Sequence, residues 1–205
     1  MQQRLWLSIA AVSEGHQPPP GSAAGDVGPG VRGDPEDTGT GAADAGDPPP
    51  EPTHAELART LVATTNRGVL STVGLDPPGY PFGSVATYAL DERGRPVVFV
   101  STMAEHTRNA TADPRASLLV AEPVAPDSDP LAAGRATLIG DLLPVPDGER
   151  AAVRTLYLDA NPASASYIDF GDFGFWRLEV RSVRYVGGYG RMSWVEPGDY
   201  RAARS

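Results

Sequence analysis

Residues 97–121, VVFVSTMAEHTRNATADPRASLLVA, carry the clearest pattern for predicting the fold of this chain. The first part of this stretch, Val97–Ser101, is a dense β-branched run, which is typical of a buried strand. Residues 104–112 have a helical pattern that stops at Asp113-Pro114, because proline disfavours helical backbone in the residue before it. Residues 116–121 again favour a strand. The stretch therefore predicts a strand, a short helix and a second strand.

Similar strand signals, separated by turn signals, lie on both sides of this stretch. They predict strands at Val69–Val73, Phe82–Leu90, Gly134–Leu143, Phe173–Val180 and Arg184–Val186, with an extension at Met192–Val195. The first three strands are joined by tight turns and should be antiparallel neighbours. Six or seven strands with two or three helices do not follow a βαβ alternation. The fold class is therefore mainly β (α+β), a small antiparallel barrel with helices packed outside.

Local signals place the helices and one irregularity. Thr53-His54-Ala55-Glu56 has the spacing of a capping box, and the helix that it opens should end near residues 66–68. Another helix is expected from Asp147 to about Leu158, and a further short one over Pro162–Ile168. Gly140, inside a predicted strand, indicates a bulge or a close approach of two backbones.

Composition excludes several classes of chemistry. The chain has 205 residues and no cysteine, so disulfides, thiolate metal sites and cysteine nucleophiles are impossible. All 17 basic residues are arginine, which excludes a Schiff-base lysine and a P-loop. With only three histidines we expect no metal centre. The net charge of −9 argues against binding to nucleic acid or to an anionic membrane.

The first quarter of the chain differs from the rest. Residues 17–53 contain 9 prolines, 8 glycines and seven acidic residues, and only one arginine. Such a segment cannot bury enough apolar surface to offset its ordering entropy. We therefore predict a disordered acidic tail over residues 1–52, a barrel domain over 53–196 and a C-terminal tail over 197–205. Residues 1–16 faintly resemble a signal peptide but have no clear cleavage site, so we expect a cytoplasmic protein.

An ordered series of short strings resembles a known family. The strings are Gly79-Tyr80-Pro81-Phe82-Gly83-Ser84, Thr87-Tyr88, Asp91-x-x-Gly94-x-Pro96, Ser101-x-x-Ala104-x-His106-Thr107-x-Asn109, Asp113-Pro114-Arg115-x-Ser117-Leu118, Gly134-Arg135-Ala136-Thr137-Leu138-x-Gly140, Tyr157…Asn161-Pro162, Phe173–Arg177 and Gly187-Gly188-Tyr189-Gly190. Their order and spacing are similar to the pyridoxamine 5′-phosphate oxidase-like split β-barrel family. The nearest branch contains the HugZ-type haem-utilisation proteins and the CREG-like barrels. The resemblance implies a six-stranded antiparallel split β-barrel with short flanking helices, working as a homodimer.

The resemblance also implies a cofactor site at the turn after the strand Val97–Ser101. Many relatives bind FMN in a groove at the dimer interface, and a helix N-terminus surrounded by hydroxyl groups suits its phosphate. The expected cofactor-binding residues are Ser84, Ser101, Thr102, His106, Thr107, Arg108 and Asn109. In the alternative, Ser101 or Thr102 merely caps the helix and His106 is an ordinary surface residue. No catalytic residue is identified.

Other residues allow two interpretations each. Arg115 and Arg135 either pair with nearby acids or reach an anionic ligand. Aromatic side chains of the last third either belong to the core or stack on a flavin ring; they are Trp176, Tyr185, Tyr189 and Trp194.

The resulting functional hypothesis is an FMN-binding oxidoreductase-like protein with an unknown small-molecule substrate. Oxidation of pyridoxamine phosphate itself is not expected, because the basic residues of true oxidases are replaced here by Ser84, Ala89, Glu105 and His106. Alternatives are a deazaflavin cofactor, a haem-binding protein of the same fold, or a cofactor-free CREG-like module. Haem degradation in the related branch uses a histidine towards the C-terminus. None follows His106 here, so His106 or Tyr189 would have to hold the iron.

Overall fold

The computed structural model describes residues 50–204. The predicted acidic tail, up to residue 49, and the signal-like segment lie outside the described residues. No helix in the described part is long and apolar enough to cross a membrane.

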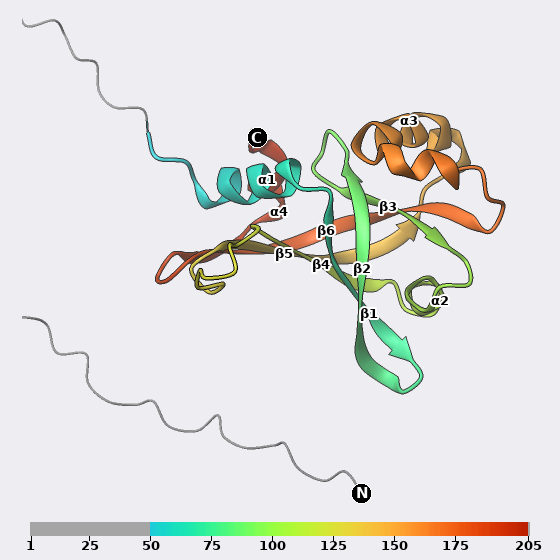
Figure 1. Ribbon diagram of the computed structural model, residues 1–205, viewed down its shortest axis with the longest axis horizontal. Coiled ribbons are helices and arrows are strands. Elements are labelled where there is room, and N and C mark those ends of the chain that lie inside the picture. Colours follow the sequence, from blue (N-terminus) through green and yellow to red (C-terminus); the bar gives the residue numbers. More distant parts are fainter. Residues whose placement is uncertain (1–49, 205) are drawn as a thin grey trace, which may run out of the picture. The chain divides into compact units, whose positions relative to one another are not determined.

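Six antiparallel strands close into a barrel (Figure 1). Their order is β3-β2-β1-β4-β5-β6, and β6 pairs back with β3, so the six-stranded barrel predicted from the sequence is confirmed. A seventh strand continues the sheet beyond β6. The strands are β1 (Arg67–Leu75), β2 (Pro78–Leu90), β3 (Pro96–Ser101), β4 (Arg115–Ala121), β5 (Gly134–Pro144), β6 (Phe173–Gly187) and β7 (Met192–Val195).

The last long strand differs from its prediction. The sequence suggested two strands, 173–180 and 184–186, but the structure has one strand, β6, of 15 residues. The irregularity lies instead in the pairing of β5 with β6, where the register shifts between Ile139 and Gly140. A Cβ atom at Gly140 would collide with the carbonyl oxygen of Glu179. The expected close approach at Gly140 is thus confirmed, and the bulge allows β6 to curve without a break.

Helices cover the outside of the barrel. The predicted capping box is present, with Thr53 accepting a hydrogen bond from the backbone N–H of Glu56 (3.2 Å). The segment 162–166 is a 3₁₀ turn, and a second 3₁₀ turn at 147–149 precedes the third helix. The helices are α1 (His54–Thr64), α2 (Glu105–Ala112), α3 (Arg150–Ala160) and α4 (Pro197–Ala202).

The C-terminal residues are part of the fold. Residues 197–202, which the sequence analysis placed in a tail, form α4. Tyr200 on this helix is fully buried, and its hydroxyl donates to the backbone oxygen of Gly94 (3.0 Å). The guanidinium of Arg59 lies over the ring, 5.5 Å from its centre. A single tyrosine in a short polar segment has no periodicity, so the sequence pattern could not indicate this helix.

Apolar residues form two packed clusters. One fills the barrel and includes Leu70, Leu118, Val120, Leu138 and Val183. The other lies between β3, β6 and α3, and includes Phe99, Tyr157, Ile168 and Phe175. β3 contributes to both, because its successive side chains point to opposite faces and both faces are covered. Strand alternation therefore sorts the chain into an inner and an outer surface.

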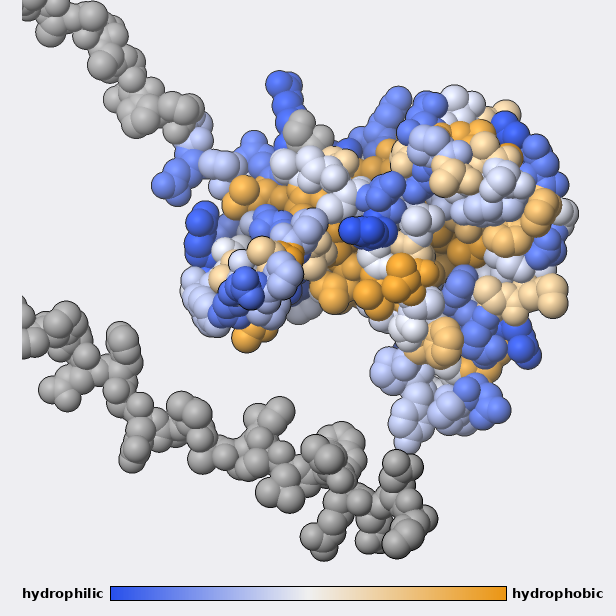
Figure 2. Space-filling view, viewed as in Figure 1, coloured by the Kyte–Doolittle hydropathy of each residue, from blue (hydrophilic) through white to orange (hydrophobic). Residues whose placement is uncertain are grey.

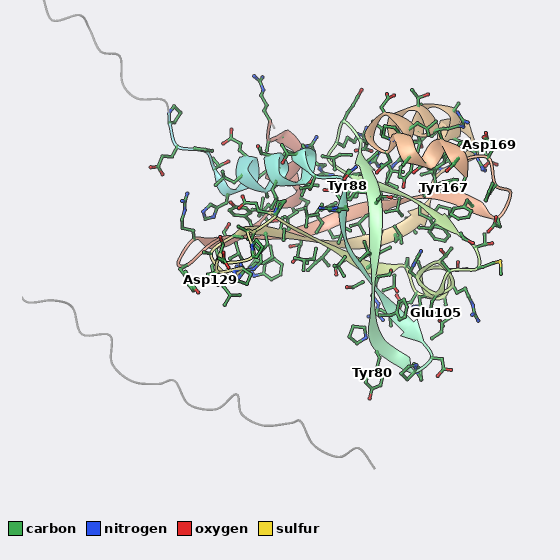
Figure 3. All side chains as sticks on the ribbon, in the orientation of Figure 1. Tyr80, Tyr88, Glu105, Asp129, Tyr167 and Asp169 are labelled. Atoms are coloured by element: carbon green, nitrogen blue, oxygen red, sulfur yellow. The ribbon has the colours of Figure 1, made fainter. Side chains whose placement is uncertain are left out.

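The burial of Tyr200 predicts a stability effect. We expect Tyr200→Ala to lower the free energy of unfolding by about 3 kcal/mol, as for other large buried aromatic side chains. Tyr80→Ala is the matched control, because Tyr80 is 66% exposed on the β1–β2 hairpin (Figure 3) and should change stability by less than about 0.5 kcal/mol. Urea unfolding measures both. Equal stability of the two variants would show that α4 does not contribute to the fold.

Candidate functional site

The turn after β3 is held by the loop that precedes β6. The hydroxyl of Ser101 donates to the carboxylate of Asp172 (2.8 Å), and the backbone N–H of Thr102 donates to the backbone oxygen of Asp172 (2.7 Å). Ser101 also accepts a hydrogen bond from the N–H of Met103 (3.1 Å). The Ser101 hydroxyl, which was expected to face a phosphate, therefore binds another part of the chain. The Asp172 carboxylate beside it also disfavours an anion.

Ser84 and His106 are brought together, as expected. Ser84 lies on β2 and His106 in the first turn of α2, with the hydroxyl oxygen 3.1 Å from Nδ1 of the ring. Among the described residues, Nε2 of His106 and the hydroxyl of Thr107 are buried and have no hydrogen-bond partner. Burial lowers the pKa of His106, so the ring is favoured in its neutral form. Nδ1 of the ring is therefore engaged by Ser84, and Nε2 is buried without a partner in the described part of the chain.

The last two predicted site residues have structural contacts. The buried side chain of Asn109 accepts a hydrogen bond from the N–H of Leu75 (3.1 Å) and donates to the hydroxyl of Thr72 (3.1 Å). These bonds attach α2 to β1. Arg108 is exposed and pairs with Glu105 at 3.4 Å. The predicted residues therefore share one region, but the structure groups them into separate contacts.

The buried imidazole predicts a pH effect on stability. Below about pH 6.5 the unfolded chain binds a proton at His106 that the folded chain disfavours, because burial lowers the folded pKa. The free energy of unfolding should thus fall as the pH drops through this region, and should gain nothing from His106 above it. We expect His106→Gln to lose less stability than the parent between pH 7.5 and 5.5, measured by urea unfolding. Parallel losses in both proteins would contradict the assignment.

A second surface, not singled out by the sequence analysis, lies on the outside of the sheet. One row of paired residues crosses six strands from β2 to β7, and its members are Val85, Val69, Leu119, Thr137, Arg184 and Trp194. The apolar members are substantially exposed, and Figure 2 shows a hydrophobic area over β2, β4 and β5. A hollow of about 350 Å³ adjoins this row; Val73, Pro81, Thr137 and Ile139 are among its lining residues.

The sequence pattern alone predicts only part of this surface. Alternation along β1, β4 and β5 shows which residues share a face, but not whether another element covers that face. The aromatic residues illustrate the difference, because Tyr185 is buried against α1 whereas Tyr189 and Trp194 are exposed. Within residues 50–204, no group of three or more His, Asp or Glu side chains is placed to hold a metal ion.

Comparison with known proteins identifies the family. A family model described as "CREG, beta-barrel" matches residues 49–202. The chain belongs to the CREG β-barrel family.

Two proteins have substantial sequence identity to this chain. A solved structure described as a heme binding protein from Mycobacterium smegmatis is 46% identical, with a TM-score of 0.70, and the match covers 76% of this chain and 62% of that one. The "Non-canonical heme oxygenase HOZ, chloroplastic" of Arabidopsis thaliana is 41% identical over 133 residues, which are 65% of this chain and 40% of the relative. This chain thus spans less than two thirds of either relative.

More distant structures share the fold alone. Campylobacter jejuni ChuZ is 19% identical with a TM-score of 0.60. The General Stress Protein 26 from Bacillus anthracis is 13% identical with a TM-score of 0.54. The family resemblance stated from the sequence is confirmed, and it includes both the haem-related and the oxidase-like barrels.

Proposed function

We propose that this CREG-family barrel binds haem. The observation that carries the proposal is the 46% identity to a structure described as a heme binding protein, over 76% of the chain. The 41% identity to a plant protein named as a heme oxygenase supports it. Haem was the alternative in the sequence analysis, and these comparisons favour it over FMN. A related barrel described as belonging to the pyridoxinephosphate oxidase family is only 16% identical and supports the fold alone.

The chemistry of haem sets two requirements on a binding surface. The porphyrin is a flat apolar ring with two carboxylates, and it needs an apolar surface with cations at its edge. The outer face of β5, β6 and β7 offers the exposed side chains of Met192 and Trp194 together with arginines, so its residues fit the ring. When bound, haem supplies redox and oxygen chemistry through its iron, while the protein supplies placement and surroundings.

The sequence predicts that either His106 or Tyr189 would hold the iron. A neutral imidazole whose second nitrogen is held by a hydroxyl group has the form that binds iron, and the contact with Ser84 provides it. Nε2 is buried, however, so iron reaches it only after the residues around α2 move. The other cofactor-binding residues predicted from the sequence, and FMN or a deazaflavin as their ligand, remain predictions.

We also propose that the protein forms a homodimer. The exposed apolar side chains of β1, β2 and β4, namely Val69, Val85 and Leu119, form the surface that we expect a second copy to cover.

Haem binding is tested by titrating the full chain with haemin. We expect a saturable Soret absorbance change that ends near one haemin per chain, and slow transfer of the haem to apomyoglobin. FMN, followed by quenching of its fluorescence, is the parallel titration. Absence of saturable haemin binding would overturn the proposal, and tight FMN binding in the same preparation would restore the FMN hypothesis.

A further inference from the structure

Two arginines and two exposed apolar side chains lie together on the outer surface of β5, β6 and β7. Pairing of these strands places Arg135 beside Val186 and Met192, and Thr137 beside Arg184 and Trp194. The members therefore form two adjacent rows on one face. We call this surface the arginine–tryptophan face; it consists of Arg135, Thr137, Arg184, Val186, Met192 and Trp194.

The two arginines of this face have no carboxylate partner within residues 50–204. Arg135 donates only to the backbone oxygens of Leu131 and Ala133 (3.2 and 3.3 Å), and Arg184 lies over the ring of Trp194, 5.4 Å from its centre. Other exposed arginines differ among themselves: some form ion pairs, whereas Arg67 and Arg150 form none within the described residues. Arg115 forms an ion pair with Asp113, and Arg181 forms one with Asp141.

Arg135 and Arg184 lie diagonally across β5 and β6 on one face, and two cations near each other repel. An anionic group placed between the two guanidinium groups removes the repulsion. Planar guanidinium groups bind carboxylates with two parallel hydrogen bonds, which favours a ligand with carboxylate groups. The charge pattern therefore points to an anionic partner.

The apolar part of the face favours a flat aromatic ring. Trp194 is 60% exposed and Met192 is 50% exposed, although large side chains of these types are usually buried. Indole and thioether groups both pack well against aromatic rings. The hollow of about 350 Å³ begins at Thr137, so the apolar surface continues from this face towards β1 and β2.

We propose that the arginine–tryptophan face binds the porphyrin, with the carboxylates on Arg135 and Arg184 and the ring over Trp194 and Met192. This inference rests on the proposed function and names the site where it occurs. It differs from the sequence prediction, because the His106 region and this face lie far apart on the barrel. Figure 3 shows Glu105, on α2, at the opposite side of the molecule from Asp129, which accepts a hydrogen bond from Tyr189 in the β6–β7 turn.

Binding at this face should not depend on iron. Neither histidine of the described chain is a member of this face: His106 is on α2, and His54, on α1, bonds through Nδ1 to the hydroxyl of Ser193 (2.8 Å), the neighbour of Trp194 in the chain. Ring stacking and carboxylate contacts are present in metal-free protoporphyrin IX as well as in haemin. We therefore expect both compounds to bind with dissociation constants within about threefold, whereas a site built on an imidazole ligand requires the metal.

The test measures the dissociation constants of both porphyrins for arginine variants. The double variant Arg135→Gln/Arg184→Gln should raise both constants at least tenfold, and Arg184→Lys should retain part of the affinity. Arg154→Gln is the matched control, because it removes one exposed arginine of α3 that pairs with Asp169 (3.0 Å) and should stay within twofold of the parent. Trp194→Phe should remove most of the tryptophan quenching that either porphyrin causes. Circular dichroism and thermal unfolding confirm that each variant is folded.

The possible failures are distinguishable. If the parent does not bind haemin, the proposed function is wrong. If the parent binds haemin and the double variant binds equally well, the function stands and this site is wrong. Loss of haemin binding in His106→Ala but not in His54→Ala, together with no binding of metal-free porphyrin, would place the haem at α2 and overturn the inference.

Discussion

The pairing of β3 with β6 closes the barrel and thereby fixes which face of each strand is inside. Five residue pairs, from Val97 with Arg177 to Ser101 with Phe173, join β3 and β6, which stand at the two ends of the six-strand order. They remove two free sheet edges and separate an inner surface from an outer one. The same pairing ends at Ser101, which brings the turn after β3 against the loop before β6. Asp172 thereby occupies the Ser101 hydroxyl, which the sequence assigned to a phosphate.

A partly buried ion network holds this closure in place. Arg177 of β6 contacts the carboxylates of Glu149 (2.7 Å) and Asp91 (3.6 Å), and Asp91 also binds Arg95 (2.8 Å). The network links the β2–β3 turn, β6 and the segment before α3. A buried pair contributes little by itself, but removing one partner leaves an uncompensated charge. These residues therefore act as a structural unit, and they contrast with the unpaired arginines of the outer face.

Sequence reasoning predicted what is local or shared with a family. The capping box at Thr53, the helix before Asp113-Pro114 and the close approach at Gly140 each depend on a few neighbouring residues, and the ordered strings supplied the barrel. What it missed depends on distant contacts. Ser101 and Asp172 are 71 positions apart, and the burial of Tyr200 depends on a turn more than 100 residues earlier. The alternation of side chains along β6 likewise assigned Arg184 no role, because it does not show whether a carboxylate lies near this arginine.

Haem binding on the arginine–tryptophan face would not require a histidine ligand. A haem protein of this branch was expected to need a C-terminal histidine, and the sequence has none after His106. That expectation assumes that the iron anchors the ligand. The ring and its two carboxylates offer much more surface than the single metal bond, and burial of apolar area is the dominant favourable contribution to most association. A face with two free guanidinium groups and an exposed indole can therefore hold the porphyrin by its plane and edge, which leaves the iron open to other ligands.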